Sequence, residues 1–355
     1  MARLQAYSGP MTALASAALF GASTPLAKLL LGGGLDPWLL AGLLYLGSGI
    51  GLGALELVRA ARGRPSAEAP LERRDLPWLA LVVLAGGIVG PLLLMVGLTH
   101  TPASSAALLL NVEGLATMGI AWLVFKEYVD RRLLVGAFAI LSGAVVLSWQ
   151  GGPTVFGPGA TAIIGACIAW GIDNNLTRKL SSADPVQIAM IKGLVAGTVN
   201  LILAATTGAR LPAVPEIALA GLVGFLGYGV SLVLFVLALR HLGAARTGAY
   251  FSAAPFIGAV LAVALFAEPI TIQLLLAALL MSGGLSLHLA ERHVHEHAHE
   301  AMEHAHRHVH DAHHQHGHGP QEPAGEPHTH AHRHQPMVHR HPHYPDLHHR
   351  HGHAH

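Results

Sequence analysis

Long apolar segments follow one another through the first 290 residues, separated by short polar or Gly- and Pro-rich breaks. A helix that crosses the hydrocarbon core of a bilayer needs about 20 consecutive apolar residues. By this measure the pattern predicts ten spanning helices in an all-α integral membrane protein. They cover roughly residues 11–31, 37–58, 76–97, 103–124, 132–149, 159–179, 186–206, 216–239, 247–267 and 271–290.

The two halves of this apolar region repeat each other. Residues 98–127 align with 239–268 at a constant offset of 141, and residues 20–28 align with 170–178 at an offset of 150. Because each half contains an odd number of helices, the halves should insert with opposite orientations, as in the inverted repeats of secondary transporters. We therefore predict three regions: a first repeat at 1–149, a second at 150–290 and a tail at 291–355.

Composition and charge agree with a membrane protein. Only 12% of the residues are charged, against about a quarter in soluble domains. A formal net charge of +1 gives no reason to expect nucleic-acid binding, and the single cysteine, Cys167, excludes a disulfide framework. With the N-terminus inside, only Lys28 and Arg210 among the basic loop residues fall on the outer side. This asymmetry predicts cytoplasmic N- and C-termini.

Polar residues within the predicted spans are the candidates for a substrate site, because ionisable groups there cost about 2.5–3.5 kcal/mol each on insertion scales. Asp173 and Lys192 each lie about six residues from the loop between their helices, at a similar depth of about 9 Å, so we expect an ion pair. The pair is either a structural clamp or a gate, and Glu113 is either a neutral link between helices or part of the transport site. The predicted substrate-binding residues are Glu113, Asn111, Asp173, Asn174, Asn175 and Lys192.

The tail holds 24 of the 27 histidines, mostly in His-x-His alternation. Neutral imidazole is a common ligand for zinc, nickel and cobalt, so the tail is predicted to bind such ions, whereas the body is expected to need no cofactor. Residues 291–311 contain no Gly or Pro and are compatible with a continuation of the last helix. In a helix, their i, i+4 histidine pairs would each chelate one metal ion. From Gly317 onward, Gly and Pro predict a disordered segment. The predicted metal ligands are His293, His295, His297, His299, His304, His306, His308 and His310.

Short motifs in both halves resemble those of an EamA-type member of the drug/metabolite transporter superfamily. The motif residues are Phe20-Gly21, Pro25, Lys28, Phe125-Lys126-Glu127, Leu134, Gly136 and Ser142-Gly143 in the first half, and Phe266-Ala267-Glu268-Pro269, Gln273 and Ser282-Gly283-Gly284 in the second. The resemblance implies a ten-helix permease in the bacterial inner membrane, with a central cavity between inverted repeats. It also implies a family similar to exporters of amino acids, metabolites and drugs. The chain departs from the pattern at Ala277, at the polar run 173–175 and in the tail.

We therefore expect a secondary transporter for a small polar metabolite or an amino-acid-like solute, with a tail that buffers or senses divalent metal ions. No nucleotide loop, metalloprotease motif or catalytic triad suggests an enzyme. Two alternatives stay open: a transporter of nickel, cobalt or zinc, and a membrane-tethered metal store or sensor that does not transport. The direction of transport and the coupling ion also stay open, and the sequence is compatible with a monomer or a homodimer.

Overall fold

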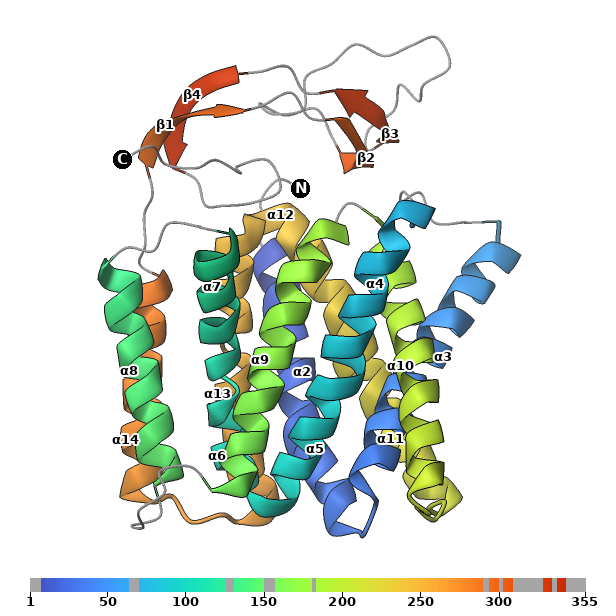
Figure 1. Ribbon diagram of the computed structural model, residues 1–355, viewed down its shortest axis with the longest axis vertical. Helices are drawn as coiled ribbons and strands as arrows, with labels where there is room; N and C mark the ends of the chain where they lie inside the picture. The colour runs from blue at the N-terminus through green and yellow to red at the C-terminus, as the bar shows by residue number, and fades with distance from the viewer. Residues whose placement is uncertain are drawn as a thin grey trace.

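The computed structural model describes residues 8–63, 70–125, 131–149, 157–180, 183–289, 294–299, 303–308, 328–333 and 337–342. Its helices run up and down through one bundle, and the strands lie beyond one end of that bundle, here called the tail end (Figure 1). The helical segments of the first half are α2 (Ser8–Gly32), α3 (Pro37–Ala61), η1 (Arg73–Asp75), α4 (Leu76–Val82), η2 (Val83–Val89), α5 (Gly90–His100), α6 (Ala103–Leu109), α7 (Val112–Phe125) and α8 (Arg131–Ser148). Those of the second half are α9 (Pro158–Leu180), α10 (Pro185–Thr206), α11 (Val214–Gly224), η3 (Phe225–Val230), α12 (Ser231–Phe251), α13 (Ala254–Phe266) and α14 (Ile272–Leu289).

All ten predicted apolar segments are helical, but two of them are interrupted and one predicted loop is not a loop. The predicted span 103–124 breaks at residues 110–111, between α6 and α7, and the span 247–267 breaks at residues 252–253. The predicted loop 240–246 is instead part of α12. In the first half, Pro102 separates α5 from α6, because proline disfavours helix at the residue before it. No proline occupies the corresponding stretch of the second half, so the helix continues there.

Seven helices of the described chain are long and apolar enough to cross a membrane: Gly9–Gly32, Pro37–Ala61, Arg73–His100, Ala103–Val124, Arg131–Ser148, Pro185–Thr206 and Val214–Ala238. Two shorter apolar helices follow them, Ala254–Phe266 and Ile272–Leu287. Large apolar side chains on several helices are exposed, for example Phe138 at 73% and Leu279 at 69%. Such extensive apolar exposure is typical of a surface that contacts lipid rather than water. The chain is therefore a multi-pass membrane protein, and the count of ten spans stays a prediction.

The same cap starts the second helix of each half. Asp36 Oδ1 accepts hydrogen bonds from the backbone N–H groups of Trp38, at 2.9 Å, and Leu39, at 3.1 Å. Asp184 Oδ1 accepts from Val186 N at 2.8 Å at the start of α10. In both helices a proline follows the aspartate, where its missing N–H has no cost. These caps fix the starts of α3 and α10 at opposite ends of the bundle (Figure 1).

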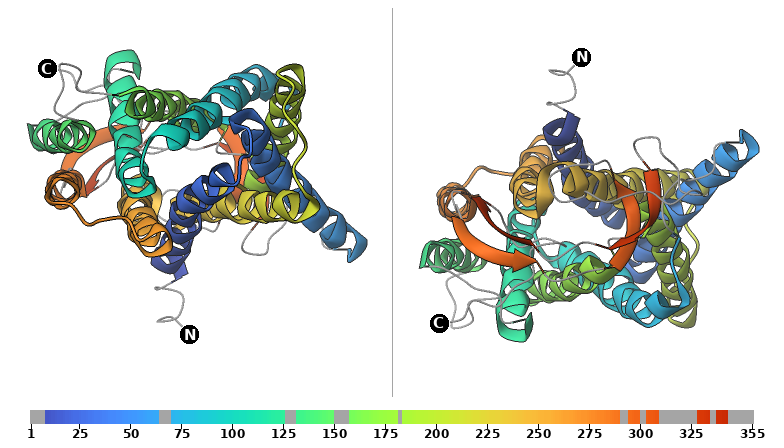
Figure 2. Two further views of the ribbon diagram at one scale, coloured as in Figure 1. Left: turned by 90° about the horizontal axis from the view of Figure 1, so that it is seen from below. Right: turned by 90° about the horizontal axis from the view of Figure 1, so that it is seen from above.

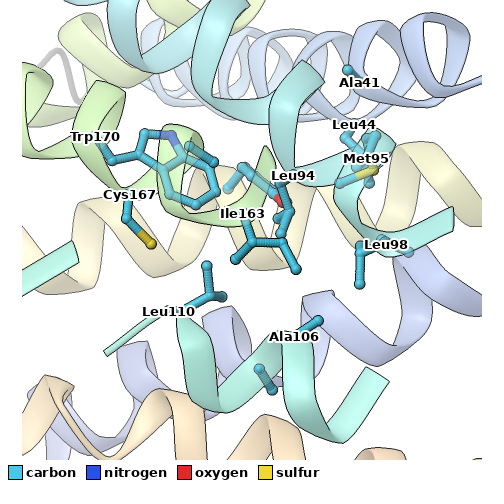
Figure 3. Packing of buried hydrophobic residues seen from close by; sticks show 14 of the residues in the cluster. Ala41, Leu44, Leu94, Met95, Leu98, Ala106, Leu110, Ile163, Cys167 and Trp170 are labelled. Atoms are coloured by element: carbon cyan, nitrogen blue, oxygen red, sulfur yellow. The ribbon is translucent and has the colours of Figure 1, made fainter. Parts of the chain in front are cut away.

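Equivalent helices of the two halves pack against each other. The helix α3 packs on α10, and α8 packs on α14 as a pair at one side of the bundle (Figure 2). The helix α2 contacts α12 and α13, while its counterpart α9 contacts α5 and α7. Buried aliphatic side chains from both halves fill the interior, among them Leu94, Leu110 and Ile163 beside Cys167 (Figure 3). These contacts of one half thus have partner contacts in the other.

Glycines let α3 and α10 approach each other closely. A Cβ atom on Gly193 of α10 would lie 2.5 Å from the backbone nitrogen of Gly49 on α3, and one on Gly197 would lie 2.5 Å from Leu46 N. Small residues at such crossings allow dispersion contacts between backbones, which hold membrane helices together.

We predict that Gly193→Ala lowers the stability of the protein by about 1–3 kcal/mol, because the added methyl group overpacks this crossing. The matched control is Gly119→Ala in α7, where an added Cβ meets no atom within 4 Å. That change should be neutral or stabilising, since alanine favours helix over glycine by roughly 0.5–1 kcal/mol. Thermal unfolding in detergent measures both, and equal stability of the two variants would contradict the close crossing.

The tail differs from the prediction. Residues Val294–His299 (β1) and Glu303–His308 (β2) are strands rather than a continuation of the last helix. They pair antiparallel with Met337–Pro342 (β4) and His328–Arg333 (β3), within the segment predicted to be disordered. The His-x-His alternation has a period of two, which matches a strand and not the 3.6-residue period of a helix. The helix that the i, i+4 chelating pairs require is therefore not formed by these residues, and metal binding by the predicted ligands stays a prediction. His293 and His310 lie outside the described chain.

Candidate functional site

A polar cluster joins α7 to α9 in the half of the bundle nearer the tail end. Glu113 lies in the first turn of α7, directly after the break at residues 110–111. Its Oε1 accepts a hydrogen bond of 2.9 Å from Asn174 Nδ2, which also lies 3.2 Å from Thr117 Oγ1. Asn174 and the neighbouring Gly114 are exposed, and Glu113 is half-buried. The amide of Asn174 thus lies at the exposed end of this contact, and the carboxylate of Glu113 lies at its more buried end.

The three consecutive polar residues of α9 have three different environments. Asn175 is buried and donates to Thr117 O at 3.0 Å and to Gly171 O at 2.8 Å. It therefore links α9 to α7, where a Cβ on Gly171 would come within 2.9 Å of Ala116. Asp173 is also buried but faces α10, and Asn174 is exposed. Of the three, Asn174 alone combines exposure with a contact to Glu113.

Asp173 and Lys192 form the predicted ion pair. Lys192 Nζ donates to Asp173 Oδ2, and the side chains are only 7% and 9% exposed for Asp173 and Lys192 respectively. The second carboxylate oxygen accepts a hydrogen bond of 3.0 Å from Thr177 Oγ1, one turn along α9. The pair thereby connects α9 to α10 and satisfies both oxygens of the buried carboxylate. A role of the pair in substrate binding stays a prediction.

The π-helical segment η2 supports this pair, and sequence reasoning missed it. A Cβ on Gly86 would lie 2.0 Å from Asp173 Oδ2, so only glycine leaves room for the carboxylate. The Gly86 carbonyl accepts hydrogen bonds from Tyr45 Oη at 2.6 Å and from Trp170 Nε1 at 3.1 Å. Single π-helical turns often mark functional sites. Two adjacent glycines, 86 and 87, lie in the middle of an apolar segment. They were the sequence feature that could have indicated this close approach.

The second half has the same arrangement without the charges. The segment η3 lies at the repeat position of η2, and Gly227 corresponds to Gly86 at the offset of 141. A Cβ on Gly227 would lie 2.7 Å from the Cβ of Ser23, the residue that corresponds to Asp173 at the offset of 150. Phe20 and Trp170, also equivalent, meet edge to face with ring centroids 6.2 Å apart. Asp173 and Lys192 thus form an ion pair beside η2, whereas the equivalent position beside η3 holds the neutral Ser23.

The candidate Asn111 and the motif residue Glu268 make structural contacts. Asn111 is buried, and its Nδ2 donates to Leu108 O at 2.8 Å, so it stabilises the break between α6 and α7. At the other end of the bundle, Glu268 accepts from the backbone nitrogens of Ala103, at 2.7 Å, and Ser104, at 3.0 Å. This carboxylate caps the positive end of α6, and Lys28 Nζ donates to Leu98 O near the end of α5.

No group of three or more His, Cys, Asp and Glu side chains is arranged to hold a metal ion in the described part of the chain. For the strand histidines the structure gives backbone positions and pairing only. Metal binding by the tail therefore stays a prediction.

Comparison with known proteins adds independent information. A family model described as the EamA-like transporter family matches residues 7–149 and 157–290. An uncharacterized transporter of Methanothermobacter thermautotrophicus is 29% identical over 298 residues, which are 80% of this chain and 86% of that protein. A probable terminal-alkyne amino-acid exporter of Streptantibioticus cattleyicolor is 27% identical over 129 residues, 36% of this chain and 43% of that protein. A crystal structure with a TM-score of 0.59 and 19% identity, covering 79% of this chain and 95% of its own, shares the fold.

Proposed function

Since the chain belongs to the EamA-like transporter family, we propose that it is a secondary transporter for a small, amino-acid-like solute that carries an ammonium group. One observation carries the choice of solute: Glu113 offers a half-buried carboxylate whose described hydrogen-bond partner is the neutral amide of Asn174. The nearby cation Lys192 is already engaged by Asp173. An ammonium group would supply the opposite charge, and ionisable groups at such depth are usually paired and functional.

The architecture supports the same proposal. We propose that all ten apolar helices cross a bacterial inner membrane as two inverted repeats, 1–149 and 150–290, with the tail 291–355 in the cytoplasm. The reciprocal packing of equivalent helices supports the inverted repeat. Discontinuous helices near the midplane form the substrate sites of such transporters, and Glu113 lies directly after such a break. The amino-acid exporter among the relatives supports a solute of this class.

Transition-metal ions are less suited to this cluster than an organic cation. Its groups are a carboxylate, an amide and a hydroxyl, which favour hard cations, whereas nickel, cobalt and zinc favour imidazole or thiolate. A metal store that does not transport would need no carboxylate in a polar cluster within the bundle. Both alternatives are distinguished from solute transport by the following experiment.

We expect reconstituted protein to exchange labelled amino acids or related amines across proteoliposomes, and we expect deletion of 291–355 to leave both the fold and this exchange intact. The helices of residues 1–290 pack against one another without contributions from the tail. The tail has no apolar periodicity with which it could pack on them. A panel of amines, matched carboxylates without an amine, and zinc or nickel ions should be assayed with both proteins. Movement of metal ions alone would contradict the proposal, as would aggregation of the truncated protein.

A further inference from the structure

The two strand pairs of the tail share one antiparallel register. The pair β1–β4 runs from Val294 opposite Pro342 to His299 opposite Met337. The pair β2–β3 continues in the same direction, starting with Glu303 opposite Arg333. In both pairs the numbers of opposite residues add up to 636. The segments 294–308 and 328–342 thus run against each other in a single register, although the sheets are separate.

The sequence itself favours this register. It places Glu296 opposite Arg340 and Glu303 opposite Arg333, so each pair of strands has one cross-strand pair of opposite charge. Such pairs contribute roughly 0.2–1 kcal/mol each, whereas like charges directly opposite each other are destabilising. A slip by one residue would remove both charge pairs and set histidines opposite other residue types.

The register collects histidines from distant parts of the tail on shared faces. Opposite residues of an antiparallel pair lie on the same face, and residues two apart along a strand do so as well. Every position on one face of β2–β3 is therefore histidine. These are His304, His306, His308, His328, His330 and His332. One face of β1–β4 carries five histidines and Met337. The five are His295, His297, His299, His339 and His341.

We propose that each of these faces is a transition-metal site of the Zn²⁺ class, with ligands from both strands. Opposite Cβ atoms in such ladders are about 4.5–5.5 Å apart, a spacing that two imidazoles can bridge to one ion with Zn–N bonds of about 2.0–2.1 Å. Two neighbouring cross-strand pairs provide the four ligands of a tetrahedral zinc. By contrast, residues four apart on one strand are separated by about 13 Å, so His295 and His299 cannot serve as a chelating pair there.

Metal binding and strand pairing then support each other. An isolated two-stranded hairpin is marginally stable in water, and a metal ion bound by both strands adds its binding free energy to their pairing. This inference goes beyond the proposed transport function and does not depend on it, because the sites belong to the tail alone.

The test is zinc titration of the full-length protein in detergent, purified without a metal-affinity step, in competition with a chromophoric chelator. The ladder variant combines His328→Ala, His330→Ala and His332→Ala on β3. The matched control combines His348→Ala, His349→Ala and His351→Ala, which removes as many histidines from outside the described strands. Because even supporting residues of metal sites are worth 10–100-fold in affinity, loss of ligands in the ladder variant should weaken the tightest zinc binding by about tenfold or more.

The control should retain the affinity of the unmodified protein. An equal loss in both variants would show that histidine density alone governs binding and would overturn the paired sites. Unchanged binding in the ladder variant would overturn them as well, as would zinc binding by the protein truncated after residue 290 that equals that of the full chain.

Discussion

Replacement of Glu113 by glutamine should abolish transport while leaving membrane insertion and the fold intact. Glutamine keeps the size of the side chain and can still meet Asn174, whose amide now donates to Glu113 Oε1. It cannot, however, provide the negative charge that an ammonium group requires. Loss of one partner of a buried, hydrogen-bonded charge pair costs about 2–5 kcal/mol. Solute affinity should therefore fall by about 30-fold or more, as measured by exchange in proteoliposomes.

The control for this experiment is Glu72→Gln. Glu72 is exposed and pairs with Arg74 at the protein surface, so its neutralisation should leave exchange unchanged. Glu113→Asp keeps the charge on a shorter side chain and should retain part of the activity. Exchange kinetics of Glu113→Gln equal to those of the unmodified protein would return Glu113 to a structural link between α7 and α9.

The second large effect should come from the ion pair of Asp173 and Lys192. Either Asp173→Asn or Lys192→Met alone leaves the other charge buried and unpaired, which costs about 3–5 kcal/mol. The double variant has no buried charge, so it should recover much of this loss. Thermal unfolding of the four proteins in detergent completes the double-mutant cycle. A double variant no more stable than the worse single variant would show that the two groups are not coupled.

An exposed pair serves as the reference for this cycle. Arg59 and Glu56 are 2.7 Å apart one turn along α3, with side chains 46% and 25% exposed. Exposed pairs of this spacing contribute about 0.3–0.5 kcal/mol, so Glu56→Gln, Arg59→Met and their combination should all unfold near the original temperature. A larger coupling free energy in the Asp173–Lys192 cycle than in the Glu56–Arg59 cycle would show that burial of the charges, and not opposite charge alone, produces the coupling.

The sequence predicts those features that depend on composition over a long stretch of chain. Apolar length locates the helices, because the bilayer sets it, and equal depth in adjacent helices predicts the pair of Asp173 and Lys192. The resemblance of the two halves anticipates their reciprocal packing. These features are predictable because the residues that the local pattern singles out are also the ones that the tertiary structure needs at those positions.

Features that depend on a neighbouring helix were not predictable from local patterns. The need for glycine at position 86 arises only because Asp173 approaches it from α9, and Tyr45 and Trp170 gain importance only through the Gly86 carbonyl. In the tail, by contrast, the local pattern did contain the needed information. Absence of Gly and Pro in 291–311 permits a helix, but the alternation of period two and a complementary segment more than twenty residues away favour strands.

The two repeats differ at one pair of equivalent positions, because only one of them holds an ion pair. This difference has a consequence for the free energies of the transporter's states. A transporter assembled from two identical five-helix chains would have its two access states at equal free energy, since exchanging the halves would change nothing. Here one place holds Asp173 with Lys192, whereas the equivalent place holds Ser23 against Gly227. In a cycle that exchanges the halves, separation of the charged contact is more costly than separation of the neutral one. In the proposed transport cycle, every 1.4 kcal/mol of that difference would favour one access state tenfold, and the resting protein would then have a preferred side.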